Sequence, residues 1–297
     1  MDKLNLMNSF VHVAELKSYT AAAAKLNKTK ALMSTHVRQL EEVLDIRLIS
    51  RSTRGFMLTE AGMSYYHQAR KIIDEISELE AGLLEGEQQM AGRLRLSVPN
   101  TFGERVMMGF MGEFMQRYPK MNIEVMLADQ FVDLINQGFD LAIRIGLLQD
   151  STMIAKEIGQ SKTVVVASRK LLGDGEFHSP DDLKGMPMIF DTNLRGERQR
   201  WTCYNDQQEY VLDLRPAVYI NSASASAQLA CSGVGFALCP YFAVKEYLEA
   251  GQLELVLPEY QFGYAPIHAV YPNRQQLSVR ARQFINEFAE YLKQEDE

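Results

Sequence analysis

The spacing of apolar residues changes once along the chain, and this change divides the sequence into two regions. Up to about residue 90, apolar residues recur every three to four positions, which is the period of helices. The pattern predicts helices over Leu4–Leu16 and Ala21–Leu26, another after Thr29 and a longer one after Thr59. From Arg93 onward, short apolar runs alternate with helical patterns, which predicts an α/β fold with parallel strand pairing.

The segment from Thr20 to Gly62 has the pattern of a winged helix-turn-helix. Thr20 and Thr29 are expected to cap two short helices, and the second carries an apolar stripe at Met33, Val37, Leu40 and Leu44. Its opposite face is polar and basic, which suits contact with base edges in a major groove. The strands Arg47–Arg51 and Phe56–Leu58, joined by a turn with Gly55, predict the wing. Each feature alone is also compatible with a small packed subdomain, but their combination favours DNA binding.

Arginines on the wing can clamp phosphates or enter a narrow minor groove. The residues expected at the DNA are Thr20, Thr29, Lys30, Ala31, Ser34, Thr35, Arg38, Arg51 and Arg54.

The long helix after Thr59 carries an apolar seam with alternating spacings of four and three. Its members are Tyr65, Ala69, Ile72, Ile76, Leu79 and Leu83. A sustained 3.5-residue period favours pairing with a second copy of the helix. We therefore expect a dimer, whose two recognition helices would contact an inverted-repeat site.

The remaining chain predicts two sets of strands and helices. The expected strands are Leu94–Val98, Ile123–Leu127, Leu141–Ile145, Thr163–Ala167, Met188–Phe190, Val218–Ile220, Phe236–Cys239 and Ile267–Tyr271. The expected helices are Glu104–Tyr118, Val132–Gln137, Ser222–Ser232 and Leu277–Leu292. The domain organisation is then a DNA-binding domain over 1–60, a linker helix over 61–90 and a regulatory domain over 91–297. Within the last, one lobe is expected to cover about 91–162 and 268–297, and the other about 163–267.

Ligands of open parallel sheets bind at the carboxyl ends of strands, beside helix N-termini. Two loops meet that description, Pro99–Gly103 in one lobe and Asn221–Ser224 in the other. Both are rich in short hydroxyl and amide side chains. Ordinary N-capping is the simpler explanation of Asn221 or Ser222 alone, but a pair of such loops in two lobes favours a binding site between them.

Charge is distributed unevenly along the 297 residues. The net charge is −7, yet residues 1–58 hold nine basic and five acidic side chains, a net +4 that leaves −11 for the rest. A basic head on an acidic body favours approach to DNA by one end. Residues 1–19 carry charged residues among the apolar ones, so neither a signal peptide nor a membrane span is predicted, and we expect a cytosolic protein without a membrane partner.

Two other function classes are less well supported. A solute-binding protein of transport would share the two lobes but not the basic head. An enzyme would need a nucleophile elbow, a phosphate-binding loop or a metal-ligand cluster, and the sequence shows none of these. Cys203, Cys231 and Cys239 lack metal-type spacing, so structural thiols are the simplest interpretation, and a redox-sensing pair remains the alternative.

The head resembles the DNA-binding domain of the LysR-type transcriptional regulators. The resemblance is carried by AAAAKL at 21–26, Ser34, the pair Leu40 and Glu41, Arg51, Arg54 and LTEAG at 58–62. Lys30, Ala31, Thr35 and Ile49 depart from the residues that are common in that family, so the base contacts at positions 30 and 35 are expected to differ.

The body resembles the family's effector domain, which has a fold like periplasmic binding proteins. Asp129–Gly146 is similar to a stretch typical of the CrgA-like branch, with Gln130 in place of a frequent Arg, and Thr101 stands where the family often places Ser or Thr toward the ligand. The residues expected at the effector are Asn100, Thr101, Phe102, Gln130, Gly146, Asn221, Ser222 and Ser224.

The resemblance implies a bacterial sequence-specific regulator that binds promoter DNA as a dimer or tetramer. It implies a small-molecule effector of unspecified identity between the lobes, no other cofactor, no enzymatic activity, and RNA polymerase as a further candidate partner.

Overall fold

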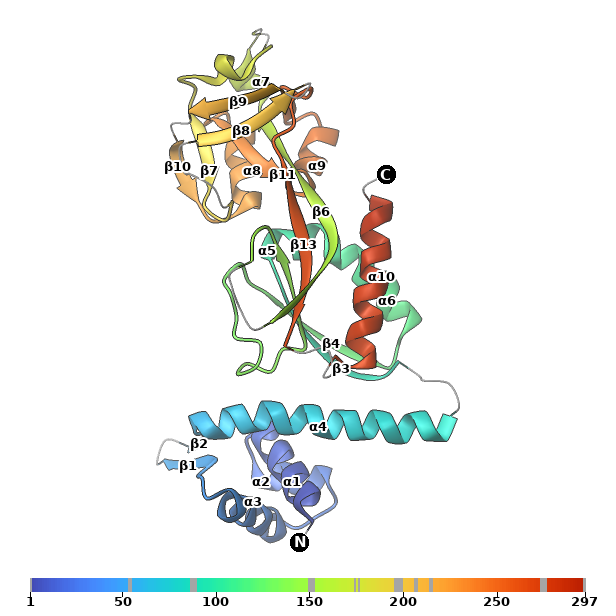
Figure 1. Ribbon diagram of the computed structural model, residues 1–297. Coiled ribbons are helices and arrows are strands. Elements are labelled where there is room, and N and C mark those ends of the chain that lie inside the picture. The colour runs from blue at the N-terminus through green and yellow to red at the C-terminus, as the bar shows by residue number, and fades with distance from the viewer. Residues whose placement is uncertain are drawn as a thin grey trace.

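The computed structural model describes residues 2–52, 55–85, 90–148, 153–173, 175, 177–194, 200–205, 208–213, 216–272 and 277–295. Figure 1 shows a small helical head with the N-terminus, a long helix α4 and a body of two lobes. α4 (Glu60–Glu85) lies between the head and the nearer lobe. None of the described helices is both long and apolar enough to cross a membrane.

The head has the three helices and the hairpin that the sequence predicts. Their bounds are α1 Lys3–Leu16, α2 Tyr19–Lys25, α3 Lys30–Leu44, β1 Ile49–Ser52 and β2 Gly55–Leu58. The predicted stripe of α3 is buried at Met33, Val37 and Leu40, which pack with α1 residues such as Phe10. Leu44 lies at the edge of this core.

Two local predictions in the head need correction. Ser18, not Thr20, caps α2, because Ser18 has extended backbone angles and its hydroxyl accepts from Ala21 N–H at 3.2 Å. The first wing strand begins at Ile49 rather than Arg47. The cap of α3 is confirmed, since Thr29 Oγ1 accepts from Leu32 N–H at 3.2 Å.

α4 begins after Thr59, whose hydroxyl accepts from Gly62 N–H at 2.9 Å, as predicted. The predicted dimer seam is wrong at its first two positions. Ala69 is 1% exposed and Tyr65 lies edge-on to Phe10, so both pack against the chain's own head. Tyr66 and Ile73 pack on the same core, so positions 65, 66, 69 and 73 form one face of a helix that lies on its own domain.

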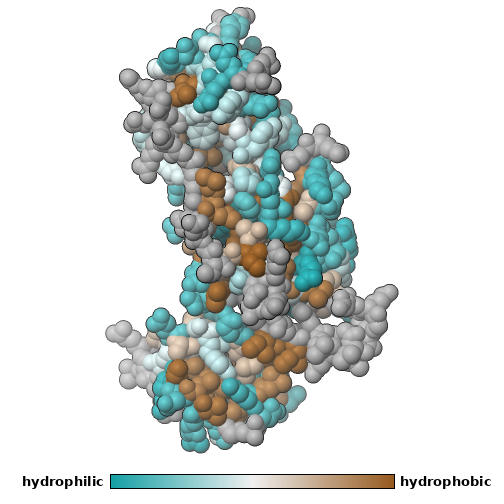
Figure 2. Space-filling view, in the orientation of Figure 1, coloured by the Kyte–Doolittle hydropathy of each residue, from teal (hydrophilic) through white to brown (hydrophobic). Residues whose placement is uncertain are grey.

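The rest of the seam can still face a second copy. Ile72 is 44% exposed and Ile76 is half-buried, while the side chains of Leu79 and Leu83 lie outside the described residues. Met63, at 45% exposed, adds a further apolar side chain on α4. Apolar surface also gathers on the visible face of the head, at the bottom of Figure 2.

The nearer lobe is built on strands β4-β3-β5, which pair in parallel as predicted. Its elements are β3 Gly92–Val98, α5 Asn100–Phe102, the π-helix η1 Gly103–Met107, α6 Met108–Arg117, β4 Met121–Leu127, β5 Leu141–Ile145 and α10 Val279–Glu295. The predicted helix Glu104–Tyr118 thus begins earlier and contains a π-turn. Aromatic rings of α6 and α10, including Phe110, Phe114 and Phe288, pack with the buried faces of β3.

Two long strands join the lobes, β6 (Ile154–Ala167) and β13 (Tyr264–Tyr271), which run antiparallel to one another. β6 pairs with β13 up to Lys162 and with β11 from Thr163 onward, so the sheet continues from one lobe into the other. The parallel pairing that the sequence predicts holds within each lobe, but the strands that join the lobes add antiparallel pairs: β13 is antiparallel to β5 and β6, and β11 and β12 are antiparallel to β6.

The far lobe has parallel strands β10-β7-β11 beside β6. Its elements are α7 Arg169–Leu172, η2 Pro180–Leu183, β7 Met188–Asp191, β8 Arg200–Asn205, β9 Gln208–Asp213, β10 Pro216–Ile220, α8 Ala223–Cys231, β11 Phe236–Pro240, α9 Tyr241–Glu249 and β12 Glu254–Val256. The sequence pattern did not predict the hairpin β8–β9, α7, η2, α9 or β12.

The predicted helix Val132–Gln137 is a turn instead. Asp133 accepts from both the main-chain and the side-chain N–H of Asn136, which favours a turn over a helix. Gly138 follows with a φ of +70° and ends the segment.

Candidate functional site

The N-terminal turns of α3 present a polar surface outward. Lys30, Ala31, Ser34 and Arg38 are exposed and Thr35 is half-exposed, as expected for a recognition helix. Thr29 is also exposed, with its hydroxyl used in the cap. Thr20 is exposed within α2 rather than at its start.

A histidine fixes α3 on α1. His36 Nδ1 lies 2.7 Å from the Oγ of Ser9, which is fully buried. Burial and, to a smaller extent, the nearby charge of Lys28 lower the pKa of His36, so the neutral ring is favoured in the folded head.

The wing is tied to α3 by one carboxylate. Glu41 is 8% exposed, and its Oε1 accepts from Leu48 N–H at 2.8 Å and from Ile49 N–H at 3.0 Å. Its Oε2 pairs with Arg47 at 3.1 Å. These bonds hold the chain where the first strand begins. Arg51 lies in β1 opposite Phe56, but its side chain and the whole of Arg54 are outside the described residues.

A cavity of about 540 Å³ lies between the two lobes. Strand ends of the nearer lobe supply Thr101, Phe102, Gln130 and Gly146, four of the eight residues predicted at the effector. The volume is in the usual range of small-molecule sites. Its other described walls include the far-lobe residues Asp191, Asn193, Trp201, Ala223 and Phe242 and the crossover residues Phe262 and Tyr264.

The other four predicted residues do not line this cavity. Asn100 donates its main-chain and side-chain N–H groups to Asp129, and Ser222 caps α8 by accepting from Ala225 N–H. Asn221 is exposed, and its carbonyl accepts from Asn193 Nδ2. Ser224 meets the opposite lobe, because its N–H donates to Thr101 Oγ1 at 3.3 Å.

Contacts among the described residues join the two lobes beside the cavity. The first is the hydrogen bond from Ser224 to Thr101. Phe102 and Phe242 form an edge-to-face ring pair with centroids 5.2 Å apart. Arg105 of η1 forms an ion pair with Glu246 of α9. The predicted meeting of the two loops across the lobes is thus found in the structure.

Arg144 is a buried cation in the wall of the cavity. It is 6% exposed, and its guanidinium donates to Ser97 and to main-chain carbonyls. Burial lowers the pKa of Arg144 to about 10, an effect that the charge of Asp129 partly offsets. Arg144 is the one charged residue of the otherwise apolar strand β5, and this pattern in the sequence could have identified it as a candidate site residue.

The far lobe contributes a buried acid to the wall of the cavity, Asp191. It is 2% exposed at the end of β7, and burial raises its pKa to about 6, with a smaller contribution from the negative charge of Asp129. Because this pKa lies above the unfolded value of 3.8, the contribution of Asp191 to folding stability is present below about pH 4 and is lost as the pH rises through 6. A buried acid that weakens the fold at neutral pH is typical of a binding site.

The three cysteines have the environment of structural thiols. Cys203 and Cys239 are buried and Cys231 is half-buried, and burial raises the pKa of all three, that of Cys203 to about 11. Thiols with raised pKa values are poor nucleophiles.

A segment over 129–140 runs from the cavity to α4. Gln130 and Phe131 line the cavity, and Ile135 C=O accepts from Gln68 Nε2 of α4 at 3.4 Å. Gly138 lies so close to α4 that a Cβ there would come within 2.4 Å of His67 Nδ1.

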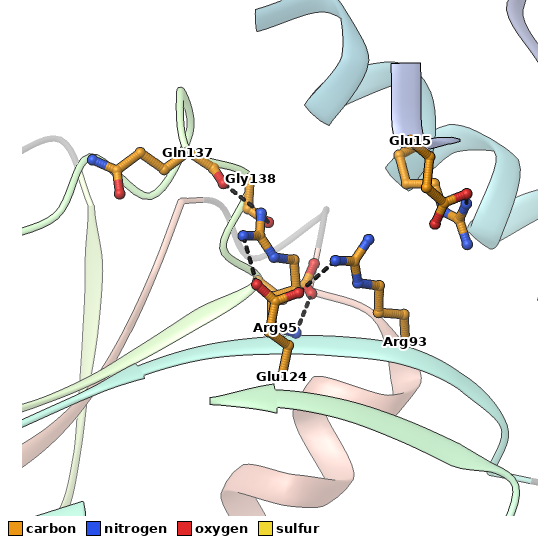
Figure 3. Close-up of polar contacts among 8 residues, drawn as sticks. Glu15, Arg93, Arg95, Glu124, Gln137 and Gly138 are labelled. Atoms are coloured by element: carbon orange, nitrogen blue, oxygen red, sulfur yellow. Dashed lines mark hydrogen bonds and ion pairs between the residues drawn. The ribbon is translucent and has the colours of Figure 1, made fainter. Parts of the chain in front are cut away.

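Arg95 of β3 holds this segment from the other side. Figure 3 shows Arg95 reaching the carbonyls of Gln137 and Gly138, while Glu124 bridges Arg95 and Arg93. Arg93 in turn hydrogen bonds to Tyr66 of α4. The cavity, the segment and α4 are therefore connected through direct contacts.

The chain combines a winged helix-turn-helix head, a long connecting helix and a two-lobed body with a cavity between the lobes. This combination defines a class of protein, the ligand-responsive DNA-binding regulators. Residues 4–63 match the bacterial regulatory helix-turn-helix proteins of the lysR family, and residues 87–293 match the LysR substrate binding domain. The chain belongs to the LysR family of transcriptional regulators.

Known regulators are similar to this chain over nearly its whole length. An uncharacterized HTH-type transcriptional regulator of Haemophilus influenzae is 35% identical, over 94% of this chain and 97% of its own. The regulator PtxR of Pseudomonas aeruginosa is 32% identical, over 98% and 94%. The structure of CrgA from Neisseria meningitidis matches 97% of this chain and 98% of its own at 27% identity and a TM-score of 0.60. That of the Vibrio cholerae virulence activator AphB matches 98% of both chains at 28% identity and a TM-score of 0.57.

The protein is thus a DNA-binding regulator of transcription with an effector-binding domain, and not an enzyme. DNA and further copies of the same chain are its partners.

Proposed function

We propose that this regulator binds inverted-repeat promoter sites through paired heads, as a dimer or tetramer, and that a small molecule in the interlobe cavity alters the placement of those heads. The effector acts by favouring one of two existing arrangements of lobes or subunits. A change in head spacing alters DNA bending and the access of RNA polymerase to the promoter. Activation or repression then depends on the position of the operator.

The contact between the segment 129–140 and α4 carries this proposal. A ligand that displaces Gln130 or Phe131 pushes on a segment whose other end touches His67 and Gln68 of α4. α4 packs on the head through Tyr65 and Ala69, so its displacement moves the DNA-binding surface. A movement at the cavity can therefore reach the head through direct contacts of the segment 129–140 and α4.

The test of the function is capture of genomic DNA fragments by the purified full-length protein, followed by sequencing. Shared inverted repeats near a few promoters would support the proposal, and the neighbouring genes would name the metabolites to test as effectors. Absence of enrichment even at low salt, with and without those metabolites, would contradict it.

Substitutions in the wing and in α3 are expected to have different effects on DNA binding. Arg51→Ala or Arg54→Ala should weaken binding to all sequences and reduce the slope of log K against log salt by about 1, as expected for a lost phosphate contact. Ser34→Ala or Lys30→Ala should instead reduce discrimination against mismatched sites, by about 1–3 kcal/mol for each lost base contact. Binding titrations at several salt concentrations distinguish the two, and equal losses of both kinds would refute these roles.

Thr101→Ala is expected to blunt the effector response without changing DNA affinity. Thr101 lines the cavity, and its hydroxyl accepts the interlobe bond from Ser224. Loss of about 0.5–1.5 kcal/mol of hydrogen bonding raises the half-saturating effector concentration about two- to thirteen-fold. Operator binding at graded effector concentrations measures this shift, and an unshifted curve would remove Thr101 from the site.

Gly138→Ala is expected to uncouple the cavity from the head. The new methyl group would meet His67 at a position with φ of +70°, so the segment must leave α4. We expect amide exchange around residues 66–68 to become about ten times faster, and the effector to change operator affinity less. Gly251→Ala is the control, because it has a similar φ of +66° but open space around it. Equal behaviour of both variants would show that the contact does not transmit the signal.

A further inference from the structure

The polar groups that line the cavity differ in how many of their hydrogen-bonding positions are already used. The described lining contains two acids, Asp129 and Asp191, and one base, Arg144. If all three are ionised, this lining carries a net charge of −1. The free hydrogen-bonding positions, rather than the net charge alone, decide which ligand group fits.

Arg144 has little capacity left for an anionic ligand. One terminal nitrogen donates to Ser97 C=O at 3.2 Å and to Ile143 C=O at 2.7 Å. The other donates to Ser97 Oγ at 2.9 Å and approaches Gln130 C=O at 3.5 Å. The fork of four N–H groups that usually grips a carboxylate is therefore occupied by the protein itself.

Asp129 is likewise satisfied within the protein. Its Oδ1 accepts from Asn100 N–H at 3.0 Å and its Oδ2 from Asn100 Nδ2 at 2.7 Å.

Asp191 is different. Its Oδ1 accepts from Asn193 N–H at 2.9 Å, and within the described part of the chain no donor reaches Oδ2. This carboxylate is 2% exposed and lines the cavity, and no cationic side chain of the described residues pairs with its free oxygen. Its Oδ2 is therefore the acceptor that the described cavity wall offers to a hydrogen-bond donor of a ligand.

We propose that the effector carries a cationic hydrogen-bond donor, a protonated amine in its simplest form, that lies against Asp191, and an apolar body of aromatic size. This inference rests on the proposed use of the cavity as the effector site. The body would contact the rings of Phe131, Trp201, Phe242 and Phe262, which line the same space. An effector whose only charge is a carboxylate is disfavoured, because it would face two acids and an arginine that is already engaged.

A bound amine would attract acids from both lobes, because Asp129 and Asp191 lie on opposite sides of the cavity. Asp129 belongs to the nearer lobe and Asp191 to the far lobe, and the charge of Asp129 contributes to the raised pKa of Asp191. A cation in the cavity removes this repulsion and attracts both lobes. The same binding event therefore favours closure of the cavity and stresses the neighbouring segment that begins at Asp129 and Gln130.

The test compares three indole probes of one frame: tryptamine, indole-3-propionate and the neutral alcohol tryptophol. Each is titrated into the full-length protein at pH 7.5 by calorimetry and by ligand-observed NMR. We expect tryptamine to bind at least ten-fold tighter than indole-3-propionate. Asp191→Asn should remove this preference, because the amide presents no negative charge to the amine. Asp181→Asn, which changes an exposed acid outside the cavity, should retain the preference.

The folding of Asp191→Asn is checked separately. The variant should melt at a higher temperature than the native protein at pH 8, since it removes a buried ionised group, and at a nearly equal temperature at pH 4. Equal or tighter binding of the carboxylate, no binding of any probe, or an amine preference that survives Asp191→Asn would overturn the inference. Genomic capture is carried out on the same preparation. If the protein captures inverted repeats but shows no preference for the amine, the inference about the effector fails while the proposed regulator function stands.

Discussion

Replacement of Glu41 by alanine is expected to release the wing from α3 and to abolish specific DNA binding. The side chain is 8% exposed and accepts from two buried main-chain N–H groups, those of Leu48 and Ile49. Each donor left unsatisfied in a buried place costs about 1–3 kcal/mol, so the loss of both bonds should cost the head about 2–6 kcal/mol of stability. The strand that carries Arg51 would then no longer have a fixed position on α3.

Amide exchange at residues 48 and 49 measures this loss directly, and operator binding measures its consequence. Glu42→Ala is the matched control, because Glu42 is the next residue of the same helix but is exposed, with an ion pair to Arg38 at 3.6 Å. It should change stability by less than about 0.5 kcal/mol. Glu41→Gln, which keeps one acceptor oxygen, should fall between the two. A Glu41→Ala protein with native exchange rates would show that water replaces the carboxylate.

Replacement of Gly62 by alanine is expected to separate α4 from the wing. A Cβ at this position would come within 1.9 Å of Leu48 O and 2.8 Å of Leu48 C. Both are main-chain atoms, so no change of rotamer relieves the overlap and the helix itself must move. Such a movement lengthens the bonds from Thr59 N–H to Leu48 O, now 3.0 Å, and from Thr59 Oγ1 to Arg47 O, now 2.7 Å.

We expect a loss of about 2–4 kcal/mol in the stability of the head, within the range for severe overpacking and lost capping, and a matching loss of operator binding. Gly112→Ala is the control, because this glycine lies in α6 with no atom within 4 Å of the added methyl group. A helical glycine in open space should gain up to about 1 kcal/mol on conversion to alanine. Similar denaturation curves for the two variants would refute the close contact at Gly62.

The head was predictable because its signals are local. The stripe of Met33, Val37 and Leu40 and the cap at Thr29 depend on residues within a few positions of one another, and the structure confirms both. Thr20 failed as a cap because Ser18, two residues earlier, meets the same local requirement. Two neighbouring hydroxyl residues cannot be distinguished by composition alone.

The cavity was only half predictable. Its position followed from the strand and helix pattern, and Thr101, Phe102, Gln130 and Gly146 do line it. Asp191 and Trp201 were missed, because each lies beside the cavity only through strand pairing and loop positions far along the chain. The expected role of Asn100 changed for the same reason, since its side chain is bound to Asp129, twenty-nine residues away.

By itself, the sequence determined the order of the parts, the helix caps and buried faces of the head, the positive charge of that head and the membership of a family. These properties depend on local periodicity and on residue type. Only the tertiary structure decided which face of α4 is free, because the burial of Tyr65 and Ala69 depends on where α1 packs. It also decided which cavity groups remain unsatisfied, because a hydrogen bond depends on distances between atoms that the sequence places far apart.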